Sequence, residues 1–289
     1  MTDLTDYAYV TDLLRRHGFR FSRSLGQNFL TAAWVPERIA EEAMIGPEDG
    51  VLEIGPGVGC LTAELARRAG RVCALELDRR LEGVLSETLD GFDNVSVVFT
   101  DALKADLKEL CKQEFGDRPW KVCANLPYNV TSPLLTSFLQ AECFRSITVM
   151  VQKEVAERLC AGPGTGEYGA FTLLAQWYAE PRLLFAVSPG CFTPRPKVTS
   201  AVVRLDVREE PPFPAEDRAF LFTVIRAAFN QRRKQLPNAL AAGVRSVDRT
   251  AVENALAKLG LPSTIRGEVL SLEQFAALAG LLSKEKGQE

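Results

Sequence analysis

VLEIGPGVG, residues 51–59, is an apolar run followed at once by glycines at alternate positions. In α/β proteins, a buried strand that enters a glycine-rich turn and then a helix is a common way to hold a nucleoside cofactor. The same pattern also forms ordinary strand-to-helix turns, so the motif by itself leaves both interpretations open. It predicts an α/β fold, and the rest of the chain supports that prediction.

Short runs rich in Val, Ile, Leu and Cys recur along the chain and are mostly separated by helix-like stretches. These runs lie at 51–54, 72–77, 95–99, 121–124, 147–151, 183–187 and 201–205. Such alternation predicts a seven-stranded, mostly parallel sheet with helices on both faces. The last two runs are joined by SPGCFTPRPK (188–197) without a helix, so we expect a hairpin and an antiparallel edge strand.

A proline-rich break, EEPPFPAED (209–217), separates this pattern from a helical tail. We therefore predict a catalytic domain over 1–208, with an N-terminal arm over 1–30, and a small all-α domain over 209–289. Near the C-terminus, Ser271 and Gln274 are spaced as a capping box at the start of a helix.

The composition limits the class of protein. With 46% hydrophobic and 25% charged residues among 289, the chain can bury a full core and that of a smaller domain. Its N-terminal segment lacks the apolar region of a signal peptide, and no window approaches the roughly 18 apolar residues of a membrane span. The seven cysteines show no C-x-x-C spacing, so we expect reduced core residues, no metal and a cytoplasmic location. A net charge of −3 means that any nucleic acid would be held by local basic surface.

The glycine motif reads E-x-G-x-G-x-G from Glu53 to Gly59. It differs from the G-x-G-x-x-G fingerprint of NAD-binding folds, because Cys60 stands where the third glycine would be. It resembles instead the first motif of Rossmann-like, class I methyltransferases that use S-adenosylmethionine. Gly55 and Gly57 are therefore predicted to let the backbone approach this cofactor without a Cβ atom in the way.

Acidic residues follow the next two predicted strands. We assign to Glu76, after VCAL, the hydrogen bonds to the ribose hydroxyls of the cofactor, and Asp78 is equally suited to cap the following helix. Asp101 is placed to accept a hydrogen bond from the adenine amine, with a helix cap as the alternative.

NLPY (125–128) follows the fourth predicted strand. The exocyclic amine of adenine is a poor nucleophile, and two acceptors on its N–H groups would aim its lone pair at a methyl sulfonium. The side-chain oxygen of Asn125 and the carbonyl of Leu126 are candidates for that pair. Pro127 would stiffen the turn and Tyr128 would stack on the base. No strong general base is needed, and the single histidine, His17, is expected at the surface.

Together these motifs resemble the ribosomal RNA adenine N6,N6-dimethyltransferases, specifically the small-subunit KsgA type. The resemblance covers nearly the whole chain. Its matching stretches are SLGQNFL (24–30), EIGPGVG (53–59), ELD (76–78), DAL (101–103), NLPYNVTSPLL (125–135), QKEVAERL (152–159), FTPRPKVTSAVVRL (192–205) and FNQRRK (229–234).

The resemblance implies functional residues that the sequence pattern does not give. It adds Asn28 and Leu30 to the cofactor site, together with Asn125. It also places Phe192 on the face of the target base opposite Tyr128, whereas the residues alone favour a core phenylalanine in a proline-rich loop. It implies that a monomer dimethylates two adjacent adenosines in the 3′-terminal hairpin loop of 16S rRNA within the assembling small subunit, during ribosome biogenesis. Such loop bases can be splayed out without breaking a duplex.

Local basic residues could hold the RNA backbone. The candidates are Arg145, Lys153, Arg158, Arg195, Lys197, Arg232, Arg233 and Lys234. Three other functions stay open at this point: an erythromycin-resistance methylase of large-subunit rRNA, a DNA adenine methyltransferase, and a binding role in ribosome assembly in which methylation is incidental. FNQRRK and FTPRPKV favour the small-subunit type over the resistance methylases.

Overall fold

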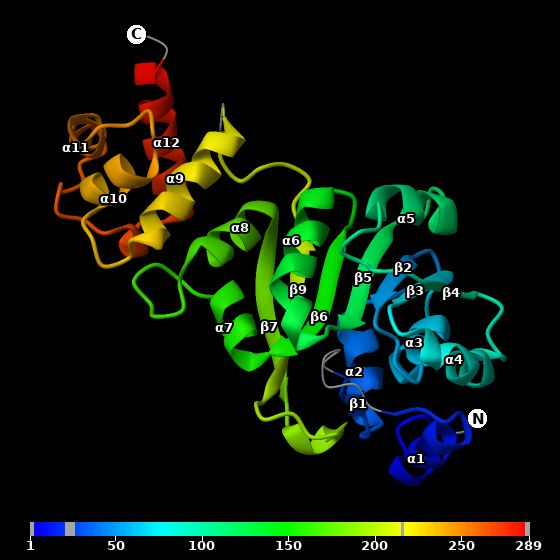
Figure 1. Ribbon diagram of the computed structural model, residues 1–289. Helices are drawn as coiled ribbons and strands as arrows, with labels where there is room; N and C mark the ends of the chain where they lie inside the picture. The colour runs from blue at the N-terminus through cyan, green and yellow to red at the C-terminus, as the bar shows by residue number, and fades with distance from the viewer. Residues whose placement is uncertain (1–2, 21–26, 215–216, 287–289) are drawn as a thin grey trace. The chain divides into compact units, whose positions relative to one another are not determined.

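The computed structural model describes residues 3–20, 27–214 and 217–286, with side chains to residue 283 (Figure 1). Ser24, Leu25 and Gly26 of the SLGQNFL motif lie outside the described residues. Contacts divide the chain into two compact units. The first unit comprises Met1–Ala156 and Glu180–Val207, and the second comprises Glu157–Ala179 and Arg208–Glu289.

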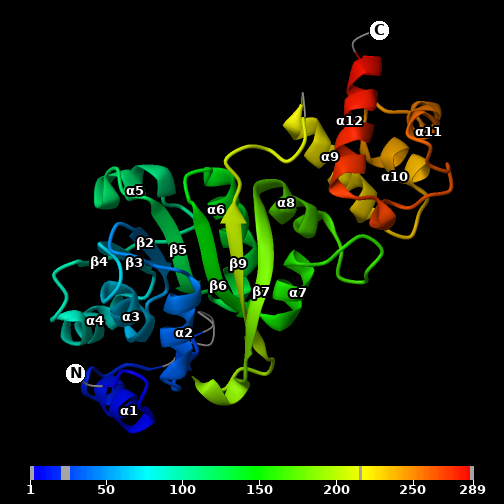
Figure 2. The same ribbon diagram turned by 180° about the vertical axis from the view of Figure 1, so that it is seen from behind.

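A seven-stranded sheet forms the centre of the first unit, in the order β4-β3-β2-β5-β6-β9-β7 (Figures 1 and 2). The strands are β2 (Gly50–Ile54), β3 (Arg71–Glu76), β4 (Val95–Phe99), β5 (Trp120–Asn125), β6 (Ser146–Gln152), β7 (Ala179–Val187) and β9 (Ser200–Val207). Each of the seven apolar runs in the sequence is a strand, and β4, β3, β2, β5 and β6 pair in parallel. The predicted Rossmann-like sheet is confirmed.

The antiparallel strand is β9, which pairs with β6 and lies between β6 and β7. The two last strands are neighbours, as the hairpin prediction required, but the edge position belongs to β7. A physical reason is present in the sequence: β7 carries Pro181, which cannot donate a ladder hydrogen bond, and the exposed Glu180 and Arg182. The apolar β9 is buried over most of its length and suits an inner position.

Helices cover both faces of this sheet. The helices of the first unit are α1 (Tyr7–Arg16), α2 (Trp34–Glu42), α3 (Cys60–Ala66), α4 (Glu82–Leu89), α5 (Leu107–Phe115), α6 (Thr131–Ala141) and α7 (Lys153–Leu159), the last of which extends into the second unit. On one face, α2 and α3 share a buried cluster with Val51 of β2. On the other face, the preceding Gly50 faces Phe115 of α5, as expected where successive strand residues alternate between faces.

A second, two-stranded sheet joins the N-terminal segment to the SPGCFTPRPK loop (188–197). Strand β1 (Phe29–Leu30) pairs antiparallel with β8 (Phe192–Thr193), and Leu30 lies opposite Phe192. Two-residue strands leave no periodic pattern, so this pairing cannot be predicted from the sequence. It brings Leu30 beside Phe192, which is 162 positions later in the chain.

The second unit is helical. It contains α8 (Ala170–Tyr178), α9 (Arg218–Asn230), α10 (Leu236–Gly243), α11 (Arg249–Lys258) and α12 (Leu272–Lys286). The capping box of α12 is confirmed, because Ser271 N–H donates to Gln274 Oε1 at 2.9 Å and Gln274 N–H donates to Ser271 Oγ at 3.2 Å. The predicted domain boundary between residues 208 and 209 stays a prediction. By contacts alone, residues 157–179 also pack with these helices, for example Trp177 edge-on to Phe222.

The seven cysteines are all free thiols, and Cys60, Cys73, Cys111 and Cys123 are buried. Burial raises the pKa of each of these four thiols, for Cys73 to about 11, which keeps them protonated and unreactive. Within 3–20, 27–214 and 217–286, none of the helices has the length and apolar character needed to cross a membrane.

Candidate active site

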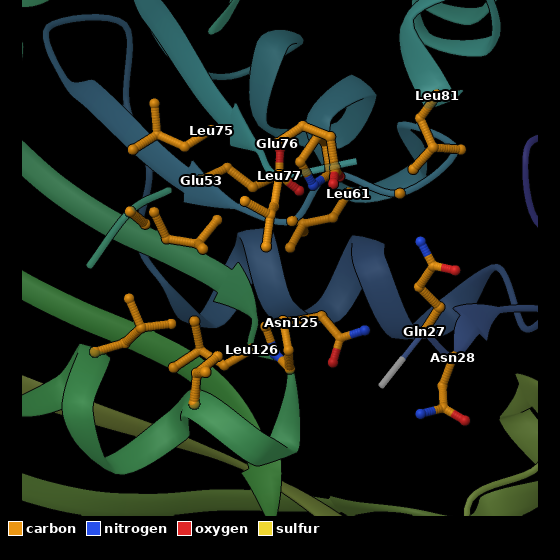
Figure 3. Close-up of a pocket in the computed structure, with 18 of the residues that line it drawn as sticks. Gln27, Asn28, Glu53, Leu61, Leu75, Glu76, Leu77, Leu81, Asn125 and Leu126 are labelled. Atoms are coloured by element: carbon orange, nitrogen blue, oxygen red, sulfur yellow. The ribbon is translucent and has the colours of Figure 1, made fainter. Parts of the chain in front are cut away.

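A pocket opens at the carboxyl ends of the central strands of the first unit. In Figure 3, Glu53 and Glu76 lie close together, Asn125 and Leu126 lie at the end of a neighbouring strand, and Asn28 approaches from the N-terminal segment. Ten of the eleven predicted site residues border this pocket. They are Asn28, Leu30, Gly55, Gly57, Glu76, Asp101, Asn125, Leu126, Pro127 and Tyr128.

The turn after β2 depends on its glycines. Gly55, Gly57 and Gly59 have φ angles of 69°, 61° and 88°, in the left-handed region that favours residues without a Cβ atom. At Gly57 a Cβ atom would also lie 3.0 Å from the ring of Phe29. The backbone therefore runs tightly between the sheet and β1, and it leaves the pocket floor open to a ligand.

Glu76 ends β3 with its carboxylate at the pocket, and the residue is only 6% exposed. One oxygen accepts a hydrogen bond from the Asp78 N–H at 2.7 Å. Burial raises the pKa of Glu76, and backbone N–H groups at the carboxylate oppose that rise. The backbone thus fixes the orientation of this side chain at the pocket.

Asp78 takes the structural role that the sequence left open. Its carboxylate accepts from the Arg80 N–H at 3.1 Å, so it caps the short helix that follows. It also binds the Arg80 guanidinium at 2.6 Å and the Gln27 amide at 2.8 Å. The Arg80 guanidinium holds the pKa of Asp78 below its usual value. Asp78 does not border the pocket, which leaves Glu76 as the acid at this strand end.

Asp101 closes a turn and is not the helix cap that the sequence offered as an alternative, because the next helix, α5, is capped by Asp106. The Oδ1 of Asp101 accepts from the Leu103 N–H at 3.0 Å, which closes the turn, and its Oδ2 lies 3.7 Å from the Lys104 ammonium. The residue nevertheless borders the pocket at the end of β4. The turn-closing bond to one oxygen leaves acceptor capacity on the carboxylate for a ligand.

Glu53 borders the pocket and was given no role by the sequence reasoning. It is 1% exposed, and its Oε2 is buried without a hydrogen-bond partner in the described part of the chain. Burial raises the pKa of Glu53 to about 8, and the charge of Glu76 adds to the rise. A carboxyl group inside an otherwise apolar strand was the available signal, because such a group is costly to bury without purpose.

Two exposed leucines also border the pocket and were missed. Leu77 is 58% exposed and Leu103 is 43% exposed, and they follow β3 and β4, which are adjacent in the sheet. Large apolar side chains at such strand ends provide flat walls for an aromatic base. Leu77 directly follows Glu76 in ELD and Leu103 lies two residues after Asp101 in DAL, but no pattern in the sequence sets either leucine apart.

The NLPY turn is held from several sides. Leu126 N–H donates to the Met150 carbonyl of β6 at 3.1 Å, and the Thr131 hydroxyl donates to the Pro127 carbonyl at 3.0 Å. The hydroxyl groups of Tyr128 and Ser200 lie 2.6 Å apart. Burial raises the pKa of Tyr128, so its side chain is a neutral phenol at physiological pH. This framework presents the Asn125 amide to the pocket from the end of β5.

Phe192 is the one predicted site residue outside the pocket lining. It is 2% exposed and belongs to the core cluster that contains Leu30 and Val35. In this conformation its ring is a core side chain, and its contact with a target base stays a prediction. His17 is partly exposed and lies 2.8 Å from Glu87, on the side of the first unit formed by α1 and α4.

Known proteins resemble this chain over nearly its whole length. A family model described as "Ribosomal RNA adenine dimethylase" matches residues 18–277. "Ribosomal RNA small subunit methyltransferase A" of Lachnoclostridium phytofermentans is 43% identical over 288 residues, which cover 99% of each chain. The protein of the same name from Bacillus mycoides is 42% identical over 290 residues, again 99% of both chains.

Two solved structures are similar over most of the chain. The 23S rRNA methyltransferase ErmE superposes with a TM-score of 0.68 at 31% identity, covering 88% of this chain and 99% of that one. A dimethyladenosine transferase from Plasmodium falciparum superposes with a TM-score of 0.75 at 25% identity, covering 90% and 98%. The similarity thus extends well beyond the glycine motif and the NLPY turn.

Proposed function

The chain belongs to the ribosomal RNA adenine dimethylase family, and from this premise we propose that its substrate is a pair of adjacent adenosines in the 3′-terminal hairpin loop of small-subunit (16S) rRNA. Its reaction is dimethylation of the N6 amine of adenosine in rRNA, with S-adenosylmethionine as cofactor. The relatives named for the small subunit are 42–43% identical over nearly the full chain, against 31% for ErmE, which acts on 23S rRNA. That difference supports the small-subunit substrate.

The pocket residues fit this cofactor. Glu53 offers a buried acceptor without a partner, Glu76 offers a fixed carboxylate, and the left-handed glycines leave room for a ligand at the backbone. A positively charged ligand with two neighbouring hydroxyl groups satisfies such acceptors. When bound, S-adenosylmethionine supplies a methyl group on a sulfonium that a nucleophile can attack. We assign its ribose to Glu76, its adenine to Asp101 with Leu77 and Leu103, and the remaining contacts to Asn28, Leu30, Gly55, Gly57 and Asn125.

The placement of Asn125 carries the proposed chemistry. Its side chain stands at the pocket wall beside Leu126, where strand β5 ends and the NLPY turn begins. The Asn125 oxygen and the Leu126 carbonyl accept hydrogen bonds from the two N–H groups of the target amine. This turns the nitrogen lone pair toward the methyl donor. Tyr128 stacks on the adenine ring and Pro127 limits the freedom of the turn. The proton is lost from an amine that becomes acidic as it is methylated, so these acceptors need not be strong bases.

The three basic side chains of the FNQRRK stretch (229–234) divide into two groups. Arg232 donates to the carbonyls of Gly166 and Thr165 at 2.7 and 2.9 Å and binds Glu268 at 2.8 Å, so it secures a loop of the second unit. Arg233 and Lys234 are exposed. We therefore assign phosphate contacts to Arg233 and Lys234 and a structural role to Arg232. We further propose that the protein acts as a monomer in the cytoplasm, on the assembling small subunit.

Methyl incorporation tests the substrate directly. Small ribosomal subunits from a strain that lacks the modification would be incubated with tritiated S-adenosylmethionine, with large subunits and plasmid DNA in parallel. We expect N6,N6-dimethyladenosine in small-subunit rRNA alone after nucleoside analysis. Label in the large subunit would assign the chain to the resistance methylases. Binding of S-adenosylmethionine without any label would favour a role in assembly.

A further inference from the structure

A hydrogen bond connects the NLPY turn to a serine 72 positions later in the chain. Ser200 is the first residue of β9, it is fully buried, and its hydroxyl lies 2.6 Å from that of Tyr128. We propose that Ser200 is a positioning residue for the methylation reaction, which holds the Tyr128 ring in the position at which it stacks on the target adenine. The inference rests on the proposed function of Tyr128.

Ser200 has a fixed backbone on both sides. It lies opposite Gln152 in the antiparallel ladder between β6 and β9. One residue earlier, the Thr199 carbonyl accepts a hydrogen bond from the Lys153 N–H at 3.0 Å. The Ser200 hydroxyl is therefore carried by the backbone of the sheet and not by the NLPY turn. A functional side chain supported from regular structure is held more accurately than one supported by a loop.

The bonds within the turn fix its backbone and leave the tyrosine side chain to be placed. The Leu126 N–H and the Pro127 carbonyl are both engaged, at 3.1 and 3.0 Å. Neither bond restrains the two side-chain torsions of Tyr128, whose ring borders the pocket. The hydroxyl end of the ring is restrained by Ser200, which thus fixes where that end of the ring lies.

The chemistry of the pair favours orientation over acid–base catalysis. Burial raises the pKa of Tyr128, so the phenol keeps its proton at physiological pH and is no base for the amine. Stacking depends on where the ring lies, and a swing of the ring would displace the N6 amine from its acceptors at Asn125 and Leu126. Small displacements of a reacting atom are costly, since a misplacement of about 1 Å can lower a rate by about 100-fold.

A double-mutant cycle tests this inference. Ser200→Ala, Tyr128→Phe and the double variant would be assayed for kcat and KM on small ribosomal subunits, with S-adenosylmethionine affinity and Tm measured in parallel. We expect each single variant to lose about tenfold in kcat, with cofactor affinity unchanged. We expect the double variant to be no slower than Tyr128→Phe, because Ser200 acts only through the phenol. Ser188→Ala is a matched control, since that exposed hydroxyl caps Gly190 in the same segment.

Three results would overturn the inference. These are an unchanged kcat for Ser200→Ala, single losses that multiply in the double variant, and a lower Tm with normal kcat, which marks a merely structural serine. If Ser200→Ala does not fold, Tyr128→Phe decides alone, because it removes one oxygen and keeps the ring: unchanged kcat refutes the inference and a tenfold loss supports it. A wild-type protein that binds cofactor and labels no small-subunit rRNA would instead refute the proposed function.

Discussion

Glu53 and Glu76 place two carboxyl groups at neighbouring strand ends in one pocket. Their surroundings separate their tasks. Glu76 is oriented by the Asp78 N–H, whereas Glu53 has one oxygen without a partner among the described residues and a pKa raised by burial to about 8. Glu53 is therefore mostly protonated at neutral pH in the absence of a cationic ligand, and it makes the stability of the first unit sensitive to pH.

Replacing Glu53 by Gln should remove that sensitivity. The folded-state pKa lies above the ordinary value of 4.5, so the stabilisation from proton binding is fully present below about pH 4.5 and is lost as the pH rises toward 8. We expect the advantage of Glu53→Gln in free energy of unfolding to grow between pH 5 and pH 8, on the order of 3 kcal/mol. Urea unfolding without cofactor at both pH values measures it. An advantage that does not change with pH would contradict the assignment.

Asn125→Ala should separate chemistry from binding. The variant lacks one of the two acceptors for the target amine, so we expect methylation at saturating S-adenosylmethionine to fall by about 100-fold or more. Affinity for small ribosomal subunits, measured by filter binding, should stay within about threefold of wild type. If both activity and particle binding disappear, Asn125 holds the RNA or the fold and its assignment to the chemistry is wrong.

Some residues of the candidate site could be predicted from the sequence and others could not. Glu76 and Asp101 were predictable because acids directly after apolar strands gather at one edge of a parallel sheet. Leu77 and Leu103 were not found, since an exposed leucine in a sequence looks like any other leucine. The core position of Phe192 depends on its pairing with β1, a contact between distant segments that no local pattern reveals.

The strands and helices were the most predictable elements. All seven apolar runs formed strands because each is long enough to be buried on both faces or against a helix. The order of the last two strands was harder, although Pro181 and its charged neighbours indicated an edge. Strands β1 and β8 were beyond reach, because two residues carry no periodicity and their pairing is stabilised by tertiary contacts.

Gly50→Ala should show how closely α5 packs on β2. A Cβ atom at residue 50 would lie 2.4 Å from the ring of Phe115, so helix or strand must shift. We expect a loss of about 1–3 kcal/mol in the free energy of unfolding, measured by urea denaturation. Gly91→Ala, with nothing within 4 Å of the added atom, should be close to neutral and serves as the control. Equal stability of the two variants would show that the contact yields at no cost.

The molecule as a whole carries a net charge of −3, so RNA affinity must come from particular basic side chains. Arg233→Ala and Lys234→Ala should each reduce the slope of log affinity against log salt by about 0.7, because each removes a phosphate contact. Arg232→Ala should leave that slope unchanged, since its guanidinium is already bound to Glu268 and two carbonyls. Titrations with small subunits at several salt concentrations test both statements. An equal drop for all three variants would place Arg232 on the RNA.

The second unit is formed by two separate stretches of chain, Glu157–Ala179 and Arg208–Glu289. In the sequence, β7 and β9 of the first unit lie between these two stretches. Anyone exchanging this unit with that of a relative therefore has to join the polypeptides at three places, after 156, before 180 and after 207. A chimera made at one junction near residue 208 would combine α8 of one parent with α9 of the other, and Trp177 would meet a foreign partner in place of Phe222. An exchange of this unit between relatives thus requires both stretches to be grafted together.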